Sequence, residues 1–250
     1  EAIVTAVKET EKKVKAPKLY DLTTLQREAN RIYGMTAKQT LDTAQNLYEK
    51  KLITYPRTDS QYLTEDMEQT ARNVVRQIYE KYQLTGPFDQ PEQPDVKKVM
   101  NNSKVTDHHA IIPTMELASC HLDELKSWEE KILFLIAVHT VMAMSKDHIY
   151  QETEIEVECQ GEIFKAKGRT VLQDGWKLFE NCFKNKDRMA IVDPDQEMKE
   201  RMPKVTQGQT FYAVAAEKTE HFTSPPKPYS EDTLLAAMET AGNKEFDEDT

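Results

Sequence analysis

The sequence predicts an α+β protein, in which a helical unit is followed by a small antiparallel β unit. In the first half of the chain, apolar residues recur at helical spacing between recognisable capping residues. Beyond Tyr150 apolar and charged residues alternate, which is typical of strands, and a helical pattern returns near the C-terminal end. The predicted division is 1–16, 17–148, 149–224 and 225–250.

Residues 1–16 are highly charged and have few apolar anchors, so we expect a connector that Pro17 closes off. Because the chain opens on Glu1 instead of Met, we also expect it to be a segment of a longer protein.

Two capping boxes predict a helical hairpin that ends near Lys51. They pair Thr23 with Gln26 and Thr36 with Gln39, and Gly34 between them is placed as the C-terminal cap of the first helix.

Three further segments complete the helical unit. Thr64, followed by two acidic residues, predicts the start of another helix, and residues 84–106 are rich in proline and polar groups, as in a long loop. Ser127 and Glu130 predict a capping box for an apolar helix that runs to about Met144.

The β unit is predicted to contain two hairpins. One turns at Gln160-Gly161 and the other at Gln207-Gly208, each with apolar and polar residues alternating on both sides. Residues 222–239, "FTSPPKPYSEDTLLAAME", then return to helix.

Charge and cysteine content limit the possible functions. The formal net charge is −10, from 33 basic and 43 acidic residues, so any nucleic-acid site must be local. Three widely spaced cysteines form neither a disulfide framework nor a zinc signature, which predicts a reducing, cytoplasmic setting. The longest apolar run, 132–144, is too short to span a bilayer, so no membrane is expected.

The stretch "YPRTDS" is the first candidate site. Pro56 disfavours helix at Tyr55, so the phenol should lie at a helix exit, where a cation is needed to make it an effective nucleophile. Arg57 could clamp a phosphate, and Thr58 and Asp59 could orient the arginine or a leaving oxygen. The alternative is an ordinary helix end with a solvent-exposed Arg57–Asp59 pair.

The stretch "DHHAIIPT" is the second candidate site. It places Asp107, His108 and His109 before a short apolar run. Histidine can transfer protons near neutral pH, but such a cluster could equally be a metal site or a pair of hydrogen-bonded histidines.

Taken together, "LYDLTTLQREANRIYGMTAKQTLDTAQNLYEKKLITYPRTDS", "DHHAIIPT" and "SPPKPYSEDTLLAAME" resemble the type IA DNA topoisomerases, closest to the bacterial topoisomerase III branch. The resemblance implies a toroidal enzyme. Its parts would be a connector from the arch domain (1–16), the tyrosine-bearing helical lid (17–148), a β-rich arch (149–224) and the start of a helical DNA-binding domain (225–250).

The resemblance also implies residue roles. Tyr55 matches the tyrosine that attacks single-stranded DNA and stays joined to the 5′ phosphate. Arg57 matches the arginine that stabilises the phosphate charge, and Thr58 and Asp59 match supporting positions. His108 matches the histidine that contacts the scissile-strand phosphate, whereas His109 is not expected to act.

The charge of the tyrosine-bearing segment agrees with phosphate binding. Residues 17–60 carry seven basic and five acidic groups, a net charge of +2 inside an acidic chain. The basic groups are Lys18, Arg27, Arg31, Lys38, Lys50, Lys51 and Arg57.

The resemblance implies Mg²⁺, held by an N-terminal Toprim domain for which this chain has no match. The cluster Asp193, Asp195 and Glu197 is interpreted as a turn with a solvated rim, so no metal site is predicted here. The fragment alone is therefore predicted to be inactive.

The implied function is breakage and rejoining of single-stranded DNA, with strand passage, relaxation of negative supercoils and decatenation. The enzyme is expected to be a nucleoid-associated monomer that needs no ATP. Two rivals are a DHH-type metal phosphoesterase and a non-catalytic module that binds single-stranded DNA or a protein, and Tyr55→Phe would separate strand breakage from DNA affinity.

Overall fold

The computed structural model describes residues 1–84, 94–180 and 204–241. The chain divides into two compact units. A sheet unit contains 1–15, 147–175 and 190–227, and a helical unit contains 16–146, 176–189 and 228–250. Each unit is described by itself.

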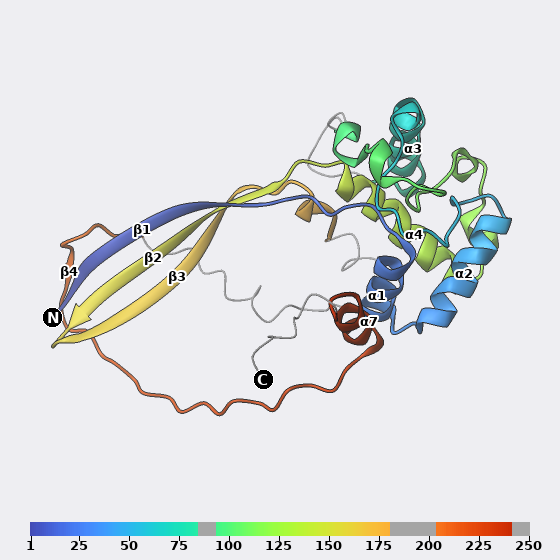
Figure 1. The fold of residues 1–250 in the computed structure, drawn as a ribbon. Helices are drawn as coiled ribbons and strands as arrows, with labels where there is room; N and C mark the ends of the chain where they lie inside the picture. Colours follow the sequence, from blue (N-terminus) through green and yellow to red (C-terminus); the bar gives the residue numbers. More distant parts are fainter. Residues whose placement is uncertain (85–93, 181–203, 242–250) are drawn as a thin grey trace, which may run out of the picture. The chain divides into compact units, whose positions relative to one another are not determined.

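The sheet unit is built on a four-stranded antiparallel sheet with the order β3-β2-β1-β4 (Figure 1). The strands are β1 (Ala2–Val14), β2 (His148–Cys159), β3 (Glu162–Gln173) and β4 (Thr210–Phe211). Gln160 and Gly161, with φ of 52° and 85°, form the two-residue turn between β2 and β3. The hairpin predicted at this turn is confirmed.

Strand β1 lies where the sequence predicted a connector with few apolar anchors, and the expectation of a connector without strand structure is wrong. Its ladder with β2 runs from Ile3↔Glu158 to Val14↔His148 and places Lys8 opposite Glu154. Opposite charges on facing strands are favourable, so a charged segment forms a strand once its partner is present. The partner lies far along the chain and is invisible to local pattern analysis.

The turn at Gln207-Gly208 also differs from its prediction. Gly208 N–H donates to the Val4 carbonyl (2.8 Å), and Val4 N–H donates to the Gln209 carbonyl (2.9 Å). Strand β4 therefore pairs with β1, and among the described residues 204–209 on its N-terminal side there is no strand. The second predicted hairpin is replaced by pairing with the N-terminal strand.

The helical unit contains five described helices (Figure 1). They are α1 (Leu22–Tyr33), α2 (Ala37–Glu49), α3 (Glu68–Tyr82), α4 (Ser127–Ala143) and α7 (Glu231–Glu239). Short 3-10 turns cover Glu65–Met67, Val96–Val99, Asn102–Lys104, Met115–Leu117 and Leu122–Glu124.

The helix caps confirm part of the prediction and correct the rest. Gly34 is the left-handed C-cap of α1 (φ 67°), and Thr36 and Gln39 form the predicted capping box of α2. Helix α1, however, begins two residues earlier than predicted, with Asp21 and Thr24 as its box. The predicted pair, Thr23 and Gln26, lies inside the helix.

Helix α4 is the central element of the core. It contacts α1, α2 and α3, and from Ile132 to its end every residue is buried, as predicted for a core helix. Its start differs by one residue from the prediction, because the Glu129 carboxylate accepts a hydrogen bond from the backbone N–H of Lys126 (3.0 Å). The pairing expected for Ser127 and Glu130 is therefore not the cap.

Several predictions fall outside the described residues. These are part of the loop predicted at 84–106, the cysteine Cys182, and the acidic cluster of Asp193, Asp195 and Glu197. In the part of the chain that is described, no helix has the length and apolar content needed to cross a membrane.

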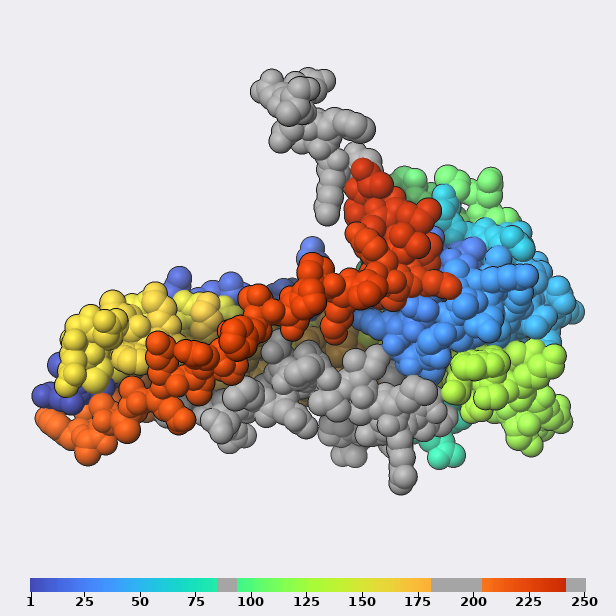
Figure 2. All heavy atoms as spheres, turned by 90° about the horizontal axis from the view of Figure 1, so that it is seen from below, coloured from blue at the N-terminus to red at the C-terminus, as the bar shows by residue number. Residues whose placement is uncertain are grey.

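Figure 2 shows the yellow-coloured strands at the surface of the sheet unit, where β3 exposes apolar side chains such as Ile163 and Phe164.

Candidate active site

Tyr55 follows the exit from α2, as its sequence context predicts. The helix ends at Glu49, and Lys51 takes a left-handed conformation (φ 61°) that turns the chain away from the helix axis. Leu52 and Ile53 then bury their side chains in the core, so the segment is anchored just before the tyrosine. The Tyr55 side chain is half-buried.

The two candidate stretches lie side by side and are joined by hydrogen bonds. Ile53 forms an antiparallel bridge with Pro113, and Thr54 N–H donates to the Ile112 carbonyl (2.9 Å). The Thr54 hydroxyl donates to the Ala110 carbonyl and accepts from the Ile112 N–H, both at 3.0 Å. Residues 53–60 and 108–113 therefore form one local structure.

This pairing brings the tyrosine and the first histidine into contact. The ring centroids of Tyr55 and His108 are 4.3 Å apart, with an interplanar angle of 44°. Tyr48, on the last turn of α2, packs edge-on against Tyr55 with a centroid distance of 5.4 Å. The imidazole of His108 and the phenol of Tyr55 thus lie in contact at a partly exposed site.

Thr58 is buried, and its hydrogen bonds hold the backbone of both stretches. Its hydroxyl donates to the His108 carbonyl (2.9 Å) and accepts from the Ser60 N–H (3.1 Å). Its own carbonyl accepts from the N–H of Leu22, the first residue of α1 (3.0 Å). The Thr58 hydroxyl proton is therefore engaged in holding the His108 backbone.

Arg57 and Asp59 alternate with the buried Thr58 and are both exposed. Over the described ranges neither side chain has a hydrogen-bond or ion-pair partner, so the surface pair considered from sequence is not formed. A guanidinium without a carboxylate partner is available to an incoming phosphate.

The remaining residues of the second stretch do not form a metal centre. Asp107 is exposed and His109 half-buried, with its Nδ1 2.9 Å from the Ala110 carbonyl oxygen. Within the described ranges, no group of three or more His, Cys, Asp or Glu side chains is placed to hold a metal ion. The described residues therefore do not fit the ligand set of a DHH-type phosphoesterase.

The net charge counted over 17–60 is a poor measure of the phosphate-binding surface. Arg27 Nε lies 3.0 Å from Asp232, and its Nη1 lies 3.0 Å from Glu239. Arg31 pairs with Glu28, and Lys50 Nζ lies 2.6 Å from the buried carboxylate of Glu129. Three of the seven basic groups are thus already neutralised, two of them by acids outside the counted segment.

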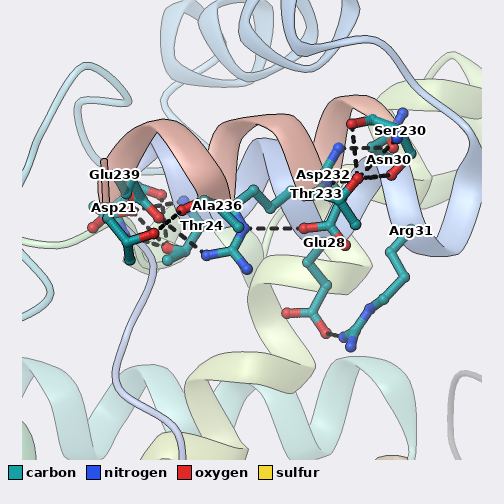
Figure 3. A network of polar contacts seen from close by, with 12 residues as sticks. Asp21, Thr24, Glu28, Asn30, Arg31, Ser230, Asp232, Thr233, Ala236 and Glu239 are labelled. Atoms are coloured by element: carbon teal, nitrogen blue, oxygen red, sulfur yellow. Dashed lines mark hydrogen bonds and ion pairs between the residues drawn. The ribbon is translucent and has the colours of Figure 1, made fainter. Parts of the chain in front are cut away.

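The carboxylates of α7 account for the pairing of Arg27. Figure 3 shows α7 lying along α1, with Asp232 and Glu239 facing it from opposite ends of the short helix. Glu231 accepts a hydrogen bond from the N–H of Ala37 at the first turn of α2 (2.6 Å), where the helix dipole favours a negative charge. This contact has no local sequence signal, because its partners are separated by about two hundred residues.

A buried polar network beside the site also went unpredicted. The Tyr20 hydroxyl donates to Glu28 (2.6 Å), and the Tyr20 ring stacks on His139 at 3.7 Å between centroids. His139 Nε2 contacts the Lys18 carbonyl oxygen at 2.7 Å. Burial raises the pKa of Tyr20, and the nearby Glu28 carboxylate raises it further. The signal available in the sequence was the single histidine inside an apolar run.

The pKa values of two other groups in the helical unit are also shifted. Burial lowers the pKa of His139, although the Glu28 carboxylate acts in the opposite direction. For Glu129, burial favours the neutral acid, but the hydrogen bonds from Lys50 and the Lys126 backbone outweigh burial and the pKa is lowered. The surroundings in the helical unit thus favour the neutral form of His139 and the ionised form of Glu129.

Comparison with known proteins gives consistent matches. A family model described as DNA topoisomerase matches residues 1–242. DNA topoisomerase 3 of Bacillus licheniformis is 38% identical over 247 residues, which covers 95% of this chain and 32% of that protein. DNA topoisomerase 3 of Bacillus subtilis is 38% identical over 244 residues, covering 96% and 32%.

A solved structure agrees with these matches. Full-length topoisomerase I from Thermotoga maritima superposes with a TM-score of 0.63 at 25% identity, covering 96% of this chain and 38% of that one. The chain spans about a third of the length of the curated relatives it matches. On the family model and these relatives, the chain belongs to the type IA DNA topoisomerases.

Proposed function

We propose that Tyr55 is the nucleophile with which the parent enzyme breaks and rejoins single-stranded DNA. The observation that supports this most directly is the contact between the Tyr55 and His108 rings, next to an arginine with no carboxylate partner among the described residues. The break would let another strand pass, which allows relaxation of negative supercoils and decatenation.

The chemical step conserves the number of phosphate ester bonds. The Tyr55 oxygen attacks a backbone phosphorus, the bond from phosphorus to the 3′ oxygen breaks, and the phenolic proton is balanced by protonation of the leaving 3′ oxygen. The 5′ phosphate stays joined to Tyr55, and the reverse reaction reseals the strand. Because the ester bond energy is retained in the phosphotyrosine, resealing needs no ATP.

Arg57 and His108 assist this step in the proposal. A phenol has an ordinary pKa of about 10 and is a weak nucleophile at neutral pH, so charge developing on the phosphate must be stabilised. Arg57 supplies that stabilisation through a planar pair of N–H donors, and His108 contacts the scissile phosphate. Thr58 holds His108 through the His108 carbonyl. Asp59 is exposed, and among the described residues no contact indicates which group it supports.

The larger assembly is also part of the proposal. Residues 17–148 would form the lid of a toroidal enzyme, 149–224 its arch, and 225–250 the start of a helical DNA-binding domain. Residues 1–16, which pair with β2, would belong to the arch. Mg²⁺ would be held by the Toprim domain of the parent enzyme. The parent would act as a monomer on nucleoid DNA in the cytoplasm.

The test compares the parent protein and its Tyr55→Phe variant on labelled single-stranded DNA with Mg²⁺, followed by denaturation and gel electrophoresis. We expect label to remain on the wild-type protein and to disappear from Tyr55→Phe, with DNA affinity within about twofold. Tyr48→Phe is the matched control, because it removes a hydroxyl next to Tyr55 while the ring that packs against Tyr55 is kept. The Tyr48→Phe protein should retain the label.

Two other outcomes would contradict the proposal. Label retained by Tyr55→Phe would assign the nucleophile to another residue. DNA binding by the wild type without any covalent label would favour a module that binds single-stranded DNA without cleaving it.

A further inference from the structure

Two lysine ammonium groups lie over the ring of Tyr62, seven residues after the candidate nucleophile. The Nζ atoms of Lys18 and Lys104 are 5.7 and 5.4 Å from the centroid of its ring. The tyrosine is half-buried, and both lysines are exposed. Within the described parts of the chain neither lysine pairs with a carboxylate, in contrast to Arg27.

The backbone around this aromatic residue is held in place. The Tyr62 carbonyl accepts from the Ala110 N–H (2.9 Å), and its own N–H donates to the Ser60 hydroxyl oxygen (3.2 Å). The Ser60 hydroxyl donates to the Lys104 carbonyl (2.8 Å). Tyr62 and Lys104 are therefore fixed relative to each other through one buried serine.

The backbone of Lys18 is also held by a hydrogen bond, whereas its ammonium group is exposed. Its carbonyl accepts a hydrogen bond from the ring of the buried His139 (2.7 Å), whereas its side chain is exposed. Both lysines thus combine an anchored backbone with a flexible stem, so their ammonium groups can move to a ligand at small cost to the fold.

Tyr62, with Lys18 and Lys104 over its ring, lies close to the candidate nucleophile. Tyr62 pairs with Ala110, which is two residues beyond His108. Two extended residues span about 7 Å, so Tyr62 lies within a few nucleotides of the Tyr55–His108 contact along any strand bound there.

We propose that Tyr62, Lys18 and Lys104 form a subsite of the single-stranded DNA track, in which one base stacks on Tyr62 and the lysines bind the flanking phosphates. This inference rests on the proposed function and adds a base-binding position to it. Aromatic rings combined with cations are the usual means of binding single strands without sequence preference.

The existing contacts between lysine and ring do not oppose this role. A cation held over an exposed aromatic ring is weakly bound, and a stacked base with its phosphate offers both groups a better partner. The local positive charge also draws the strand to this part of an acidic chain.

The experiment uses the parent protein carrying Tyr55→Phe, so that binding is measured without cleavage. Affinity is determined for a single-stranded oligonucleotide and for a series in which one base at a time is abasic. We expect Tyr62→Ala to weaken binding about tenfold and Tyr62→Phe to bind within about twofold. One abasic position near the cleavage point should weaken binding in the Tyr62 protein and have no effect in Tyr62→Ala.

Two controls separate this subsite from general effects. Tyr150 is half-buried, with Arg169 over its ring at 5.0 Å, but it belongs to the sheet, so Tyr150→Ala should leave affinity unchanged. Lys18→Ala and Lys104→Ala should each lower the slope of log affinity against log salt by about one. Thermal unfolding of each variant checks that the fold is retained.

The subsite is excluded if Tyr62→Ala binds like Tyr62→Phe, or if the abasic penalty at every position persists in Tyr62→Ala. It is also excluded if both lysine variants keep the full salt slope. These outcomes are distinct from failure of the proposed function, which would appear as loss of covalent label in the protein with Tyr55 intact.

Discussion

Two arginines of the helical unit have opposite surroundings. Arg27 on α1 contacts two carboxylates of α7 at 3.0 Å each and is partly buried beneath that helix. Arg57, after Tyr55, is exposed, and among the described residues it contacts no acid. In the sequence both arginines belong to the same weakly basic segment. Only the structure shows that Arg27 is paired with carboxylates and that Arg57 is open to a ligand.

The difference shows that counting charges along a chain overestimates a binding surface. A guanidinium with two ion pairs must lose them before it can bind phosphate, whereas an unpaired guanidinium loses only water. Among the described residues, Arg57 and the lysines near Tyr62 have no acidic partner, and the proposals above assign phosphate contacts to them, whereas Arg27 on α1 contributes cohesion with α7.

The largest expected difference between the two arginines is in catalysis. Arg57→Ala in the parent protein should reduce the rate of covalent complex formation about 100-fold, because the charge developing on the phosphate loses its stabilisation. Arg27→Ala should stay within about threefold of wild type. Single-turnover cleavage of labelled DNA at saturating concentration measures both. Equal losses would show that pairing with α7 does not remove Arg27 from the chemistry.

A smaller effect is expected on stability, where the order of the two arginines is reversed. Arg27→Ala should lower the free energy of unfolding by about 1 kcal/mol, or the melting temperature by about 2–4 °C, because the half-buried Asp232 and the exposed Glu239 lose their partner. Arg57→Ala should leave the melting temperature unchanged. Arg31→Ala, which removes an exposed pair within α1, is the matched control and should cost about 0.3 kcal/mol. A fall for Arg57→Ala equal to that for Arg27→Ala would refute the contrast.

The smallest effect concerns the pH dependence of stability through His139. Burial lowers the pKa of this histidine in the folded state, whereas Glu28 opposes the shift; Tyr20, Arg31 and the Lys18 carbonyl complete its surroundings. The unfolded chain therefore binds the proton more readily. Stability should be full above pH 6.5 and fall as the pH drops toward the folded pKa.

Thermal unfolding between pH 5.5 and 8 tests this, with His139→Gln as the variant. The wild type should lose a few degrees toward the acid end, and the variant should lose less. An identical slope in both proteins would mean that other groups control the pH dependence.

The sequence predicted the elements of the site better than their connections. Local patterns correctly placed Tyr55 beyond a helix exit and Gly34 at a helix end. The contact of Tyr55 with His108 depends on Thr54 and Thr58, whose hydroxyls bond to backbone groups about fifty residues away. Threonine hydroxyls give no sequence signal of their partners, so the joining of the two stretches could not be derived locally.

The errors have the same origin. Asp21 starts α1 through its capping box with Thr24, and the first helical N–H, that of Leu22, is also satisfied by the Thr58 carbonyl, a tertiary contact that the competing Thr23 pattern does not include. Strand β1 was missed because its charged residues find their complement on β2. Where two local patterns compete, contacts distant in sequence decide between them.

If Tyr55 cuts DNA as proposed, Thr58 has a consequence for what happens after the cut. Through its hydroxyl, its carbonyl and its place three residues after Tyr55, it fastens the tyrosine, His108 and the start of α1 into one body. If that body moves while it carries a covalently bound DNA end, the phosphate travels with its arginine and histidine already in place. The cut end then needs only the return of the free 3′ hydroxyl, because its half of the rejoining site has never been taken apart.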